Sequence, residues 1–306
     1  MPKPRDLAAP AGERRIVVLG DVIGDIVVVP SGPIRNDTDT PSSIQQRPGG
    51  SAANAASWLG SLGAPVDFVG RVGAAELAQH NAVFSGFGVT PHLTGDPEHP
   101  TGAIVVIVEG NSRSMLTERG ANDFLSADDV TDELLDHASV VHFTGYSIYH
   151  GDDHAAVRRL FERAAARGVA VSIDPASAGS LADFGAAQFL ELIDGAGLLF
   201  PNLDEGRALT GLEDPVAIAL ALGERFPIVA LTLGADGVII AQPDREPVLI
   251  PVVESAIIDP TGAGDAFVAG FLASWTMHGD LVAAARAGAV VAAGAVTRVG
   301  GRPAHP

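Results

Sequence analysis

The stretch Asp259-Pro-Thr-Gly-Ala-Gly-Asp265, followed at once by AFVAGFLASW (266–275), decides the fold and chemistry expected of this chain. Gly262 and Gly264 allow a sharp turn that directs successive backbone N–H groups at one point. The apolar pattern after them predicts a helix, whose first turn adds unpaired N–H groups and the positive end of the helix dipole. These groups predict an anion site, most naturally for a phosphate in transfer. Asp265 stands at its edge, where a carboxylate can take a proton from an attacking hydroxyl.

Of three other interpretations of this stretch, one stays open, one fits poorly and one is excluded. From seven residues alone, a glycine-rich turn before an ordinary helix is an equal alternative, because short glycine motifs are weak signals. A dinucleotide-binding GxGxxG fits poorly, since Phe267 stands at the third glycine position and the motif lies near the end of the chain. A Walker A loop is excluded because the only lysine is Lys3.

Composition narrows the classes of function. The chain has 306 residues, 47% of them hydrophobic, and no stretch long and apolar enough for a membrane span, which predicts a globular protein without a membrane partner. The start MPKPRDLAAPAGERR lacks a secretory apolar segment, so we expect residues 1–14 to form a disordered tail. The absence of cysteine fits a cytoplasmic location. The net charge of −18 argues against a nucleic-acid partner, so backbone N–H groups and bound cations would have to attract a nucleotide.

Apolar runs rich in β-branched residues alternate with helical patterns along the chain. This alternation predicts one α/β domain over residues 1–306, a three-layer αβα arrangement with a mostly parallel central sheet. The first strand is expected at Arg15–Leu19 and to extend through VIGDIVVV (22–29), and a helix is expected from Ser51 to Leu62. Two turn-rich or hairpin-like insertions, at about 27–48 and 101–120, break the rhythm. They predict a small β-sheet lid over a cleft, with a surface sheet of no function as the alternative.

Several separated segments, in order, resemble the ribokinase-like (PfkB) carbohydrate kinases. The 259–265 run resembles the C-terminal signature of that family, and PGGSAANAASWLGSLG (48–63) resembles its N-terminal signature. The remaining matches are LGDVIGDIVV (19–28), LFPNLDEGRALTG (199–211), LTLGADG (231–237) and GAVTRVGGRP (294–303). The resemblance therefore spans nearly the whole chain.

The resemblance implies an ATP-dependent kinase and a role for each matching residue. Asp265 would be the catalytic base, and Gly262, Ala263 and Gly264 would hold the phosphoryl oxygens. The acceptor would be bound by Asp25, Gly49, Gly50 and Asn54. The nucleotide would be bound by Asp174, Asn202, Thr232, Gly234, Gly237 and Gly264. Asn202 and Glu205 would organise Mg²⁺ through water, although these two also suit a helix N-cap with a charged first turn. In isolation, Asp25 also suits a turn at a strand end, and Asn54 a cap.

The resemblance also implies a K⁺ site and a dimer. Oxygen atoms of Asp259, Thr261, Ala295, Arg298 and Gly300 would surround K⁺, and Ala304 stands where relatives often have serine. The lid would leave an apolar face or edge uncovered, with Val105, Ile107 and Met115 as candidates. A symmetric homodimer through the lids would cover that surface.

Departures from the family pattern bear on the phosphoryl acceptor. Pro260 removes an N–H outside the glycine cradle, which leaves the expected catalysis intact. Ile23 and Ser51 replace an asparagine and a lysine of ribokinases proper, so two polar contacts to ribose are missing and ribose is disfavoured. A sugar derivative such as an aldonic or keto sugar, or a nucleoside such as pseudouridine, stays open as the acceptor. A non-catalytic sensor and a dehydrogenase are the rival classes, and the retained Asp265 and the poor GxGxxG weigh against them.

Overall fold

The computed structural model describes residues 15–110, 112–150 and 153–304. The tail expected over residues 1–14 lies outside these ranges.

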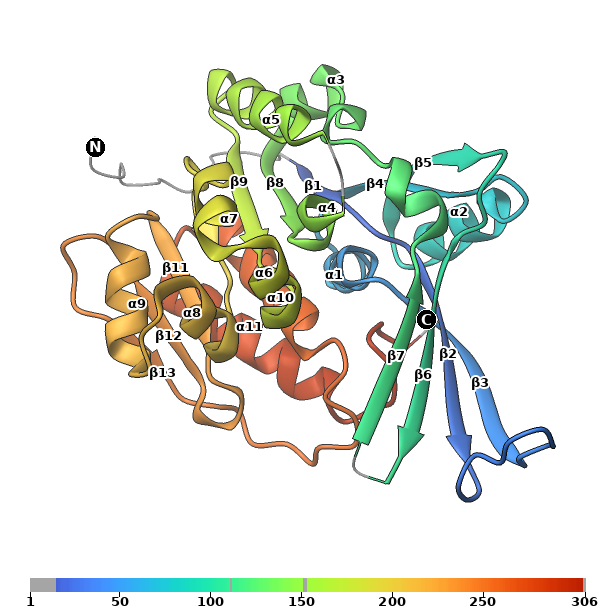
Figure 1. Ribbon diagram of the computed structural model, residues 1–306. Helices are drawn as coiled ribbons and strands as arrows, with labels where there is room; N and C mark the ends of the chain where they lie inside the picture. Colours follow the sequence, from blue (N-terminus) through green and yellow to red (C-terminus); the bar gives the residue numbers. More distant parts are fainter. Residues whose placement is uncertain (1–14, 111, 151–152, 305–306) are drawn as a thin grey trace.

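A mostly parallel sheet of nine strands runs through the centre of the described residues. The strands are β1 (Arg15–Leu19), β4 (Val66–Gly73), β5 (Val89–Asp96), β8 (Ala138–Thr144), β9 (Ala170–Asp174), β10 (Leu198–Leu199), β11 (Ile228–Thr232), β12 (Val238–Ala241) and β13 (Val248–Ile250). Their order across the sheet is β13-β12-β11-β10-β9-β8-β1-β4-β5 (Figure 1). The β11–β12 and β12–β13 pairs are antiparallel, and the other pairs are parallel.

Helices cover both faces of this sheet. They are α1 (Ser51–Ser61), α2 (Leu77–Gly86), α3 (Asp132–His137), α4 (Tyr146–Tyr149), α5 (His154–Ala166), α6 (Ala178–Phe184), α7 (Ala186–Leu192), α8 (Leu203–Thr210), α9 (Pro215–Gly223), α10 (Ala263–His278) and α11 (Leu281–Ala295), with 3₁₀ turns at η1 (Gly120–Phe124), η2 (Ala127–Asp129) and η3 (Gly234–Asp236). Helices α1, α2, α10 and α11 pack on one face, against Ile16 and Val18. Helices α3 to α9 pack on the other, against Val17 and Leu19. Successive strand residues point to opposite faces, and the predicted three-layer αβα fold is confirmed. None of the helices in the described part of the chain is both long and apolar enough to cross a membrane.

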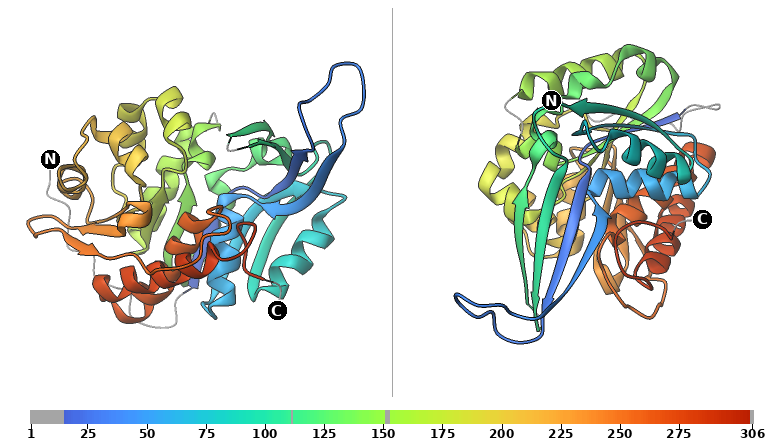
Figure 2. Two further views of the ribbon diagram at one scale, coloured as in Figure 1. Left: turned by 90° about the horizontal axis from the view of Figure 1, so that it is seen from below. Right: turned by 90° about the vertical axis from the view of Figure 1, so that its right-hand side faces the viewer.

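A second, smaller sheet forms the lid and projects from the body (Figures 1 and 2). In the described residues it has four strands: β2 (Ile23–Pro30), β3 (Ser42–Gly49), β6 (Gly102–Glu109) and β7 (Ser112–Glu118). Their order is β3-β2-β6-β7, with β2 and β6 parallel and the outer pairs antiparallel. The predicted small β-sheet lid is therefore present.

The expected extension of the first strand through residues 22–29 is wrong. The chain leaves the central sheet after Leu19, and β2 begins at Ile23 in the lid sheet. The break is stabilised by Asn122, whose amide nitrogen donates to the carbonyl of Val22 and whose Oδ1 accepts from the Val22 N–H, both at 3.0 Å. A distant side chain thus satisfies backbone groups that a continued strand would have paired. A pattern of apolar residues along one strand does not reveal such a break.

The register of the lid strands places their apolar side chains on two faces. Val27 pairs with Val106, which pairs with Met115, so these three share the face that lines a cavity described below. The opposite surface, here called the outer lid face, carries Ile26, Val28, Ile44, Val105, Ile107 and Leu116. Val105 and Ile107 thus lie on the uncovered face, as expected, but Met115 lies on the cavity face. Alternation along a strand sets these faces once the register is known.

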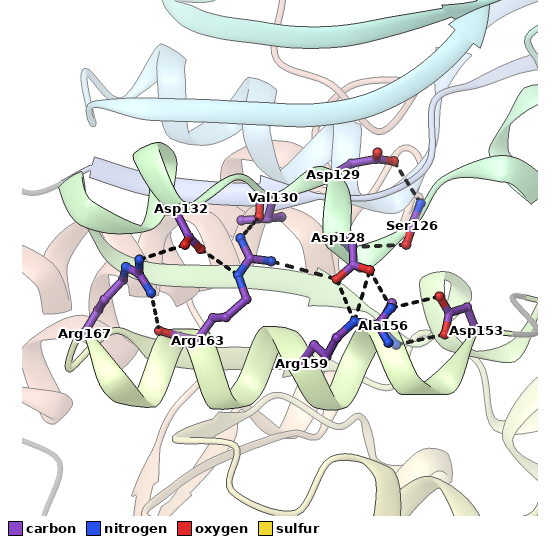
Figure 3. Close-up of polar contacts among 10 residues, drawn as sticks. All are labelled: Ser126, Asp128, Asp129, Val130, Asp132, Asp153, Ala156, Arg159, Arg163 and Arg167. Atoms are coloured by element: carbon purple, nitrogen blue, oxygen red, sulfur yellow. Dashed lines mark hydrogen bonds and ion pairs between the residues drawn. The ribbon is translucent and has the colours of Figure 1, made fainter.

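A ladder of ion pairs joins α5 to the η2–α3 segment (Figure 3). Arg159 pairs with Asp128 at 2.5 Å, and Arg163 pairs with Asp132 at 2.7 Å. One helical turn further on, an Arg167–Asp136 pair at 2.7 Å continues the series. The aspartates are about half exposed, so water screens each pair and its contribution to stability is small. The ladder aligns two surface elements. It also pairs three of the arginines with aspartates at a place away from the strand ends that form the site.

Candidate active site

Two adjoining cavities form the candidate site. The larger, called the lid cavity, has a volume of about 630 Å³ and lies beneath the lid sheet. The smaller, called the helix cavity, has a volume of about 350 Å³ and lies at the N-terminus of α10. Ser51, the first residue of α1, lines both. A group bound in one cavity can therefore meet a group bound in the other at this residue.

The lid cavity has a largely apolar wall and a polar end. The wall comes from the lid strands: Ile23, Val27, Val29, Ile104, Val106, Val108 and Met115. The polar end lies where the lid meets the body and includes Asp21, Asp25, Ser51, Arg119, Tyr146 and His150. Such a cavity suits an acceptor with hydroxyls at one end and an apolar surface at the other.

The start of α10 forms the floor of the helix cavity. Gly262 caps the helix in the left-handed region at φ 75°, and an added Cβ there would lie 2.5 Å from the Cα of Gly301. Gly262, Ala263, Gly264 and Asp265 all line the cavity. The N–H groups of the first helical turn have no carbonyl partner within the helix, so they can bind an anion in this space. The helix start has the backbone geometry that the predicted cradle requires, and anion binding there stays a prediction.

Asp265 is held by two donors from α1. Its Oδ1 accepts from the Ser51 hydroxyl at 2.5 Å, and its Oδ2 accepts from the Asn54 amide nitrogen at 2.8 Å. Burial raises the pKa of Asp265 to about 6, while the two hydrogen bonds act in the opposite direction. A carboxylate with this pKa is largely ionised at neutral pH and basic enough to share a proton with a hydroxyl.

Asp25 and the two glycines before α1 meet as expected. The carboxylate of Asp25 lies against Gly49, where any Cβ would overlap it. Gly50 is in the left-handed region at φ 91° and packs on the carbonyl of Asp21. Burial raises the pKa of Asp25 to about 6. Gly50 and Asp25 both line the lid cavity.

Asp21 is a candidate that the sequence analysis missed. It follows β1, is buried and lines the lid cavity, and its Oδ1 accepts from the Ala52 N–H at 3.4 Å. Burial raises its pKa, against the charge of Arg119. The signal that could have found it is its place at the end of the first strand, four residues before Asp25. Carboxyl ends of parallel strands are where ligands bind in such sheets.

Asn54 has partners that differ from those expected. It is buried, and its amide lies between Asp265 and Arg302, whose Nε donates to Asn54 Oδ1 at 3.4 Å. Both of these contacts are made within the protein, and a direct contact of Asn54 with the acceptor stays a prediction. Arg302 was also missed as a site residue, although it lies in the matched segment GAVTRVGGRP (294–303).

Asn202, Glu205 and Asp174 also line the helix cavity. Asn202 and Glu205 form a capping box on α8: Asn202 Oδ1 accepts from the Glu205 N–H at 2.9 Å, and Glu205 Oε2 accepts from the Asn202 N–H at 2.9 Å. Burial raises the pKa of Glu205 to about 7. The pKa of Asp174 is raised by burial and by the neighbouring charges of Glu205 and Asp265. A buried carboxyl group whose pKa is raised by two neighbouring carboxylates would be stabilised in its ionised form by a cation.

The expected nucleotide loop follows β11. Thr232 lines the helix cavity, and its N–H donates to the Pro201 carbonyl at 2.9 Å. Gly234 and Gly237 bracket η3 in the left-handed region, at φ 61° and 94°. The Leu233 N–H donates to the Gly237 carbonyl at 2.8 Å and closes this turn. Contact of the two glycines with a nucleotide stays a prediction.

The segments expected to hold K⁺ are brought together by Asp259. Its Oδ1 accepts from the Thr261 hydroxyl at 2.6 Å, and its Oδ2 accepts from the Gly300 N–H at 3.1 Å. The Ala295 carbonyl accepts from the Arg298 N–H at 3.2 Å, in the turn that ends α11. Asp259 and Thr261 lie in the segment before α10, whereas Ala295, Arg298 and Gly300 lie at the end of α11 and in the segment after it. The arrangement is compatible with a cation site without testing it.

The fold and this site define a class of protein. A buried carboxylate at a helix N-terminus, between one cavity bordered by helix N–H groups and another with a polar end, is compatible with a phosphotransferase that has an alcohol acceptor. The sequence profile of pfkB family carbohydrate kinases matches residues 13–306, and the chain belongs to this family. Kinases of the family use ATP and phosphorylate sugars or nucleosides.

Individual relatives include both types of kinase. A ribokinase of Haemophilus influenzae is 29% identical over 96% of this chain and 95% of its own length. The crystal structure of adenosine kinase from Sinorhizobium meliloti superposes with a TM-score of 0.85 at 25% identity, covering 96% of this chain and 97% of that one. Arabidopsis thaliana ribokinase complexed with ribose and ATP has a TM-score of 0.79 at 25% identity, covering 96% of each chain.

The pKa of Asp265 predicts an acid limit to turnover. Ionised Asp265 is lost as the pH falls through about 6, so kcat should decrease about tenfold per pH unit below that point. The Ser51→Ala variant removes a hydrogen bond that lowers this pKa, so its limit should move to higher pH. Ser57→Ala is the matched control, because Ser57 is buried on the same helix and its hydroxyl donates to the Ala53 carbonyl at 2.7 Å. Equal acid limits for the wild type and Ser51→Ala would contradict the assignment.

Proposed function

We propose that the protein transfers the γ-phosphate of ATP to a hydroxyl, expected to be primary, of a small sugar or sugar derivative. The observation that carries this proposal is the position of Asp265. Its carboxylate lines the helix cavity and accepts a hydrogen bond from Ser51, which also lines the lid cavity. An acceptor hydroxyl beside Ser51 would thus lie between the base and the space for a phosphate.

The proposed step uses groups of this chain on both sides of the transferred phosphoryl group. Asp265 takes the proton of the acceptor hydroxyl while the hydroxyl oxygen forms a bond to the γ-phosphorus. The bond from that phosphorus to the bridging oxygen breaks, and ADP leaves. The N–H groups of Gly262 to Gly264 donate to the phosphoryl oxygens, where negative charge is greatest during transfer. Asp25 would accept hydrogen bonds from other hydroxyls of the acceptor and fix its orientation.

The carboxyl cluster fits Mg²⁺ bound largely through water. Glu205 already accepts hydrogen bonds from the backbone N–H and the amide of Asn202. Among the described residues, no group of three or more acidic or imidazole side chains forms a ready-made metal site. Mg²⁺ retains much of its water, so Asn202, Glu205 and Asp174 would hold its hydration shell. When bound, Mg²⁺ would neutralise charge on the phosphates.

The acceptor is the less constrained partner. Ile23 is buried in the cavity wall, and Ser51 is committed to Asp265, so neither offers the polar contact to ribose that ribokinases have. A second candidate, a nucleoside, is favoured by the apolar wall of the lid cavity, which could pack on a flat base. The superposition on adenosine kinase from Sinorhizobium meliloti supports the same alternative.

A panel of acceptors tests the proposed function. ADP formation is measured with MgATP and ribose, fructose, 2-keto-3-deoxygluconate, pseudouridine and other nucleosides. Loss of two hydrogen bonds predicts that ribose is used about tenfold to several hundredfold less well than the best acceptor. The control is Asp265→Asn, which should bind ATP normally and lose about two to four orders of magnitude in turnover. If ribose is the best acceptor in this panel, our interpretation of Ile23 and Ser51 is wrong. Near-native turnover by Asp265→Asn would refute the mechanism. ATP binding without phosphorylation of any acceptor would indicate a sensor.

A K⁺ site is proposed beside the anion cradle. Its support is the hydrogen bonding that joins Asp259 to Thr261 and Gly300, next to the first residues of α10. A cation there would add positive potential to the cradle in an acidic protein. Replacing Na⁺ with K⁺ at constant ionic strength should therefore raise kcat. Identical rates in the two salts would count against the site, an outcome that Ala304 in place of serine would explain.

A symmetric homodimer through the outer lid face is also proposed. Its support is the set of six apolar residues on that face, with Ile44 and Leu116 63% and 61% exposed. A two-fold axis would pair the face with itself and remove it from water. Light scattering at micromolar concentration should show a dimer. Ile107→Asp should yield a monomer, while Met277→Asp, at a residue 75% exposed on α10, should remain dimeric. A monomeric wild type would remove the dimer and leave the kinase assignment intact.

A further inference from the structure

Arg302 is a buried cation beside the candidate site. It is 7% exposed, and its guanidinium lies 5.2 Å from the centre of the Phe84 ring. Its Nη2 donates to the Gly49 carbonyl at 2.7 Å, and its Nε donates to Asn54 Oδ1 at 3.4 Å. A guanidinium taken out of water is costly unless its surroundings compensate for the charge. Its location therefore requires an explanation in terms of its neighbours.

The contact with Arg302 determines which way the Asn54 amide faces. Arg302 is only a donor, so the atom of Asn54 that faces it must be the carbonyl oxygen. The amide nitrogen then faces Asp265 and donates to Oδ2 at 2.8 Å. In the reverse orientation, the amide oxygen would face the carboxylate and the amide nitrogen would face the guanidinium, and both contacts would be repulsive. Arg302 thus selects the orientation in which Asn54 supports the base.

The charge of Arg302 also compensates for the carboxylates around it. Its pKa is lowered to about 10 by burial, so it remains charged at neutral pH, and its neighbours include Asp21, Asp25 and Asp265. Other titratable groups lie near the same residues. Arg119 acts on Asp21, and Arg47 acts on Asp25. Asp174 is a neighbour of Asp265, and His80 of α2 is a neighbour of Arg302 itself. Arg302 differs from Arg47 and Arg119 because its charge acts on all three of the aspartates that converge on the site.

We infer that Arg302 is a positioning residue for phosphoryl transfer, which orients Asn54 against the base Asp265 and ties the acceptor-binding Gly49–Gly50 turn to the C-terminal segment. The inference rests on the proposed function for its catalytic consequence, while the geometry of Arg302 is independent of the acceptor. Gly301 supports the same contact: its carbonyl accepts from Trp58 Nε1 at 2.9 Å, and a Cβ at this position would overlap the Asn54 amide. Arg302 acts through Asn54 and has no direct role in the chemical step.

The experiment compares Arg302→Met, which removes the charge and both donors, with Arg302→Lys, which keeps the charge but cannot reproduce the paired hydrogen bonds. The control is Arg225→Gln, because Arg225 lies 5.8 Å from the Phe226 ring and pairs with Asp194, away from both cavities. Thermal unfolding, the KM values for ATP and acceptor, kcat against pH, and ¹³C NMR titration of the aspartate carboxyl groups without substrates are measured for each variant.

For Arg302→Met we expect kcat to fall about 10- to 100-fold, a change of about 1.4–2.7 kcal/mol in the barrier, with KM for ATP unchanged. Its acid limit and the NMR titration of Asp265 should both move up by about half to one pH unit, because a positive charge has been removed. Arg302→Lys should retain the wild-type acid limit and recover only part of kcat. Arg225→Gln should match the wild type in both kcat and the acid limit.

The opposing outcomes are equally defined. A normal kcat and acid limit in folded Arg302→Met would overturn the inference, as would an unchanged Asp265 titration. If Arg302→Met does not fold, the Arg302→Lys variant decides: wild-type kcat would overturn the orienting role, and reduced kcat with an unshifted acid limit would support it. If no acceptor is phosphorylated, the proposed function fails, whereas the NMR titration still tests the effect of Arg302 on Asp265.

Discussion

The close approach of three backbone segments, 49–54, 262–265 and 300–302, is the constraint on which the site depends. Gly262 packs on Gly301, and Gly301 packs on the Asn54 amide, at separations that leave no room for a Cβ. The first turns of α1 and α10 can therefore meet, and Ser51 and Asn54 reach Asp265. Because these segments come from opposite ends of the chain, the hydrogen bonds that hold Asp265 form only when the whole domain is folded.

An excess of buried acid is the main electrostatic feature of the site. Asp21, Asp25, Asp174, Glu205 and Asp265 all have raised pKa values, and burial is the leading cause for each. A highly charged nucleotide would be repelled by such a site unless positive potential were supplied locally. The N-terminus of α10, the buried Arg302 and the proposed Mg²⁺ and K⁺ ions would supply it. These sources of positive potential would allow a chain with a net charge of −18 to bind phosphate groups without a lysine in the site.

The lid combines two apolar faces in one thin sheet. Its inner face forms the wall of the lid cavity, and its outer face is partly open to solvent. The strands that contribute Asp25 and Arg47 to the polar end of the cavity also contribute Ile26 and Ile44 to the outer face. A partner that covers the outer face would therefore stiffen the same strands that enclose the acceptor. Acceptor binding and assembly would then be coupled mechanically through β2 and β3.

Apolar periodicity along the chain was enough to predict the three-layer fold and the lid. Adjacent residues at 262–265 were enough to predict an anion cradle, whose binding of phosphate stays a prediction. The sequence by itself could not show that β2 leaves the central sheet, which depends on Asn122 bonding to Val22, 100 residues away. The tertiary structure alone revealed that Ser51 and Asn54 hold Asp265, that Asp21 lines the lid cavity, and that Arg302 contacts Asn54. The sequence separations in these contacts reach 214 and 248 residues. Local patterns carry no information on such pairs, since the residues meet only when the packing of helices on the sheet brings their segments together.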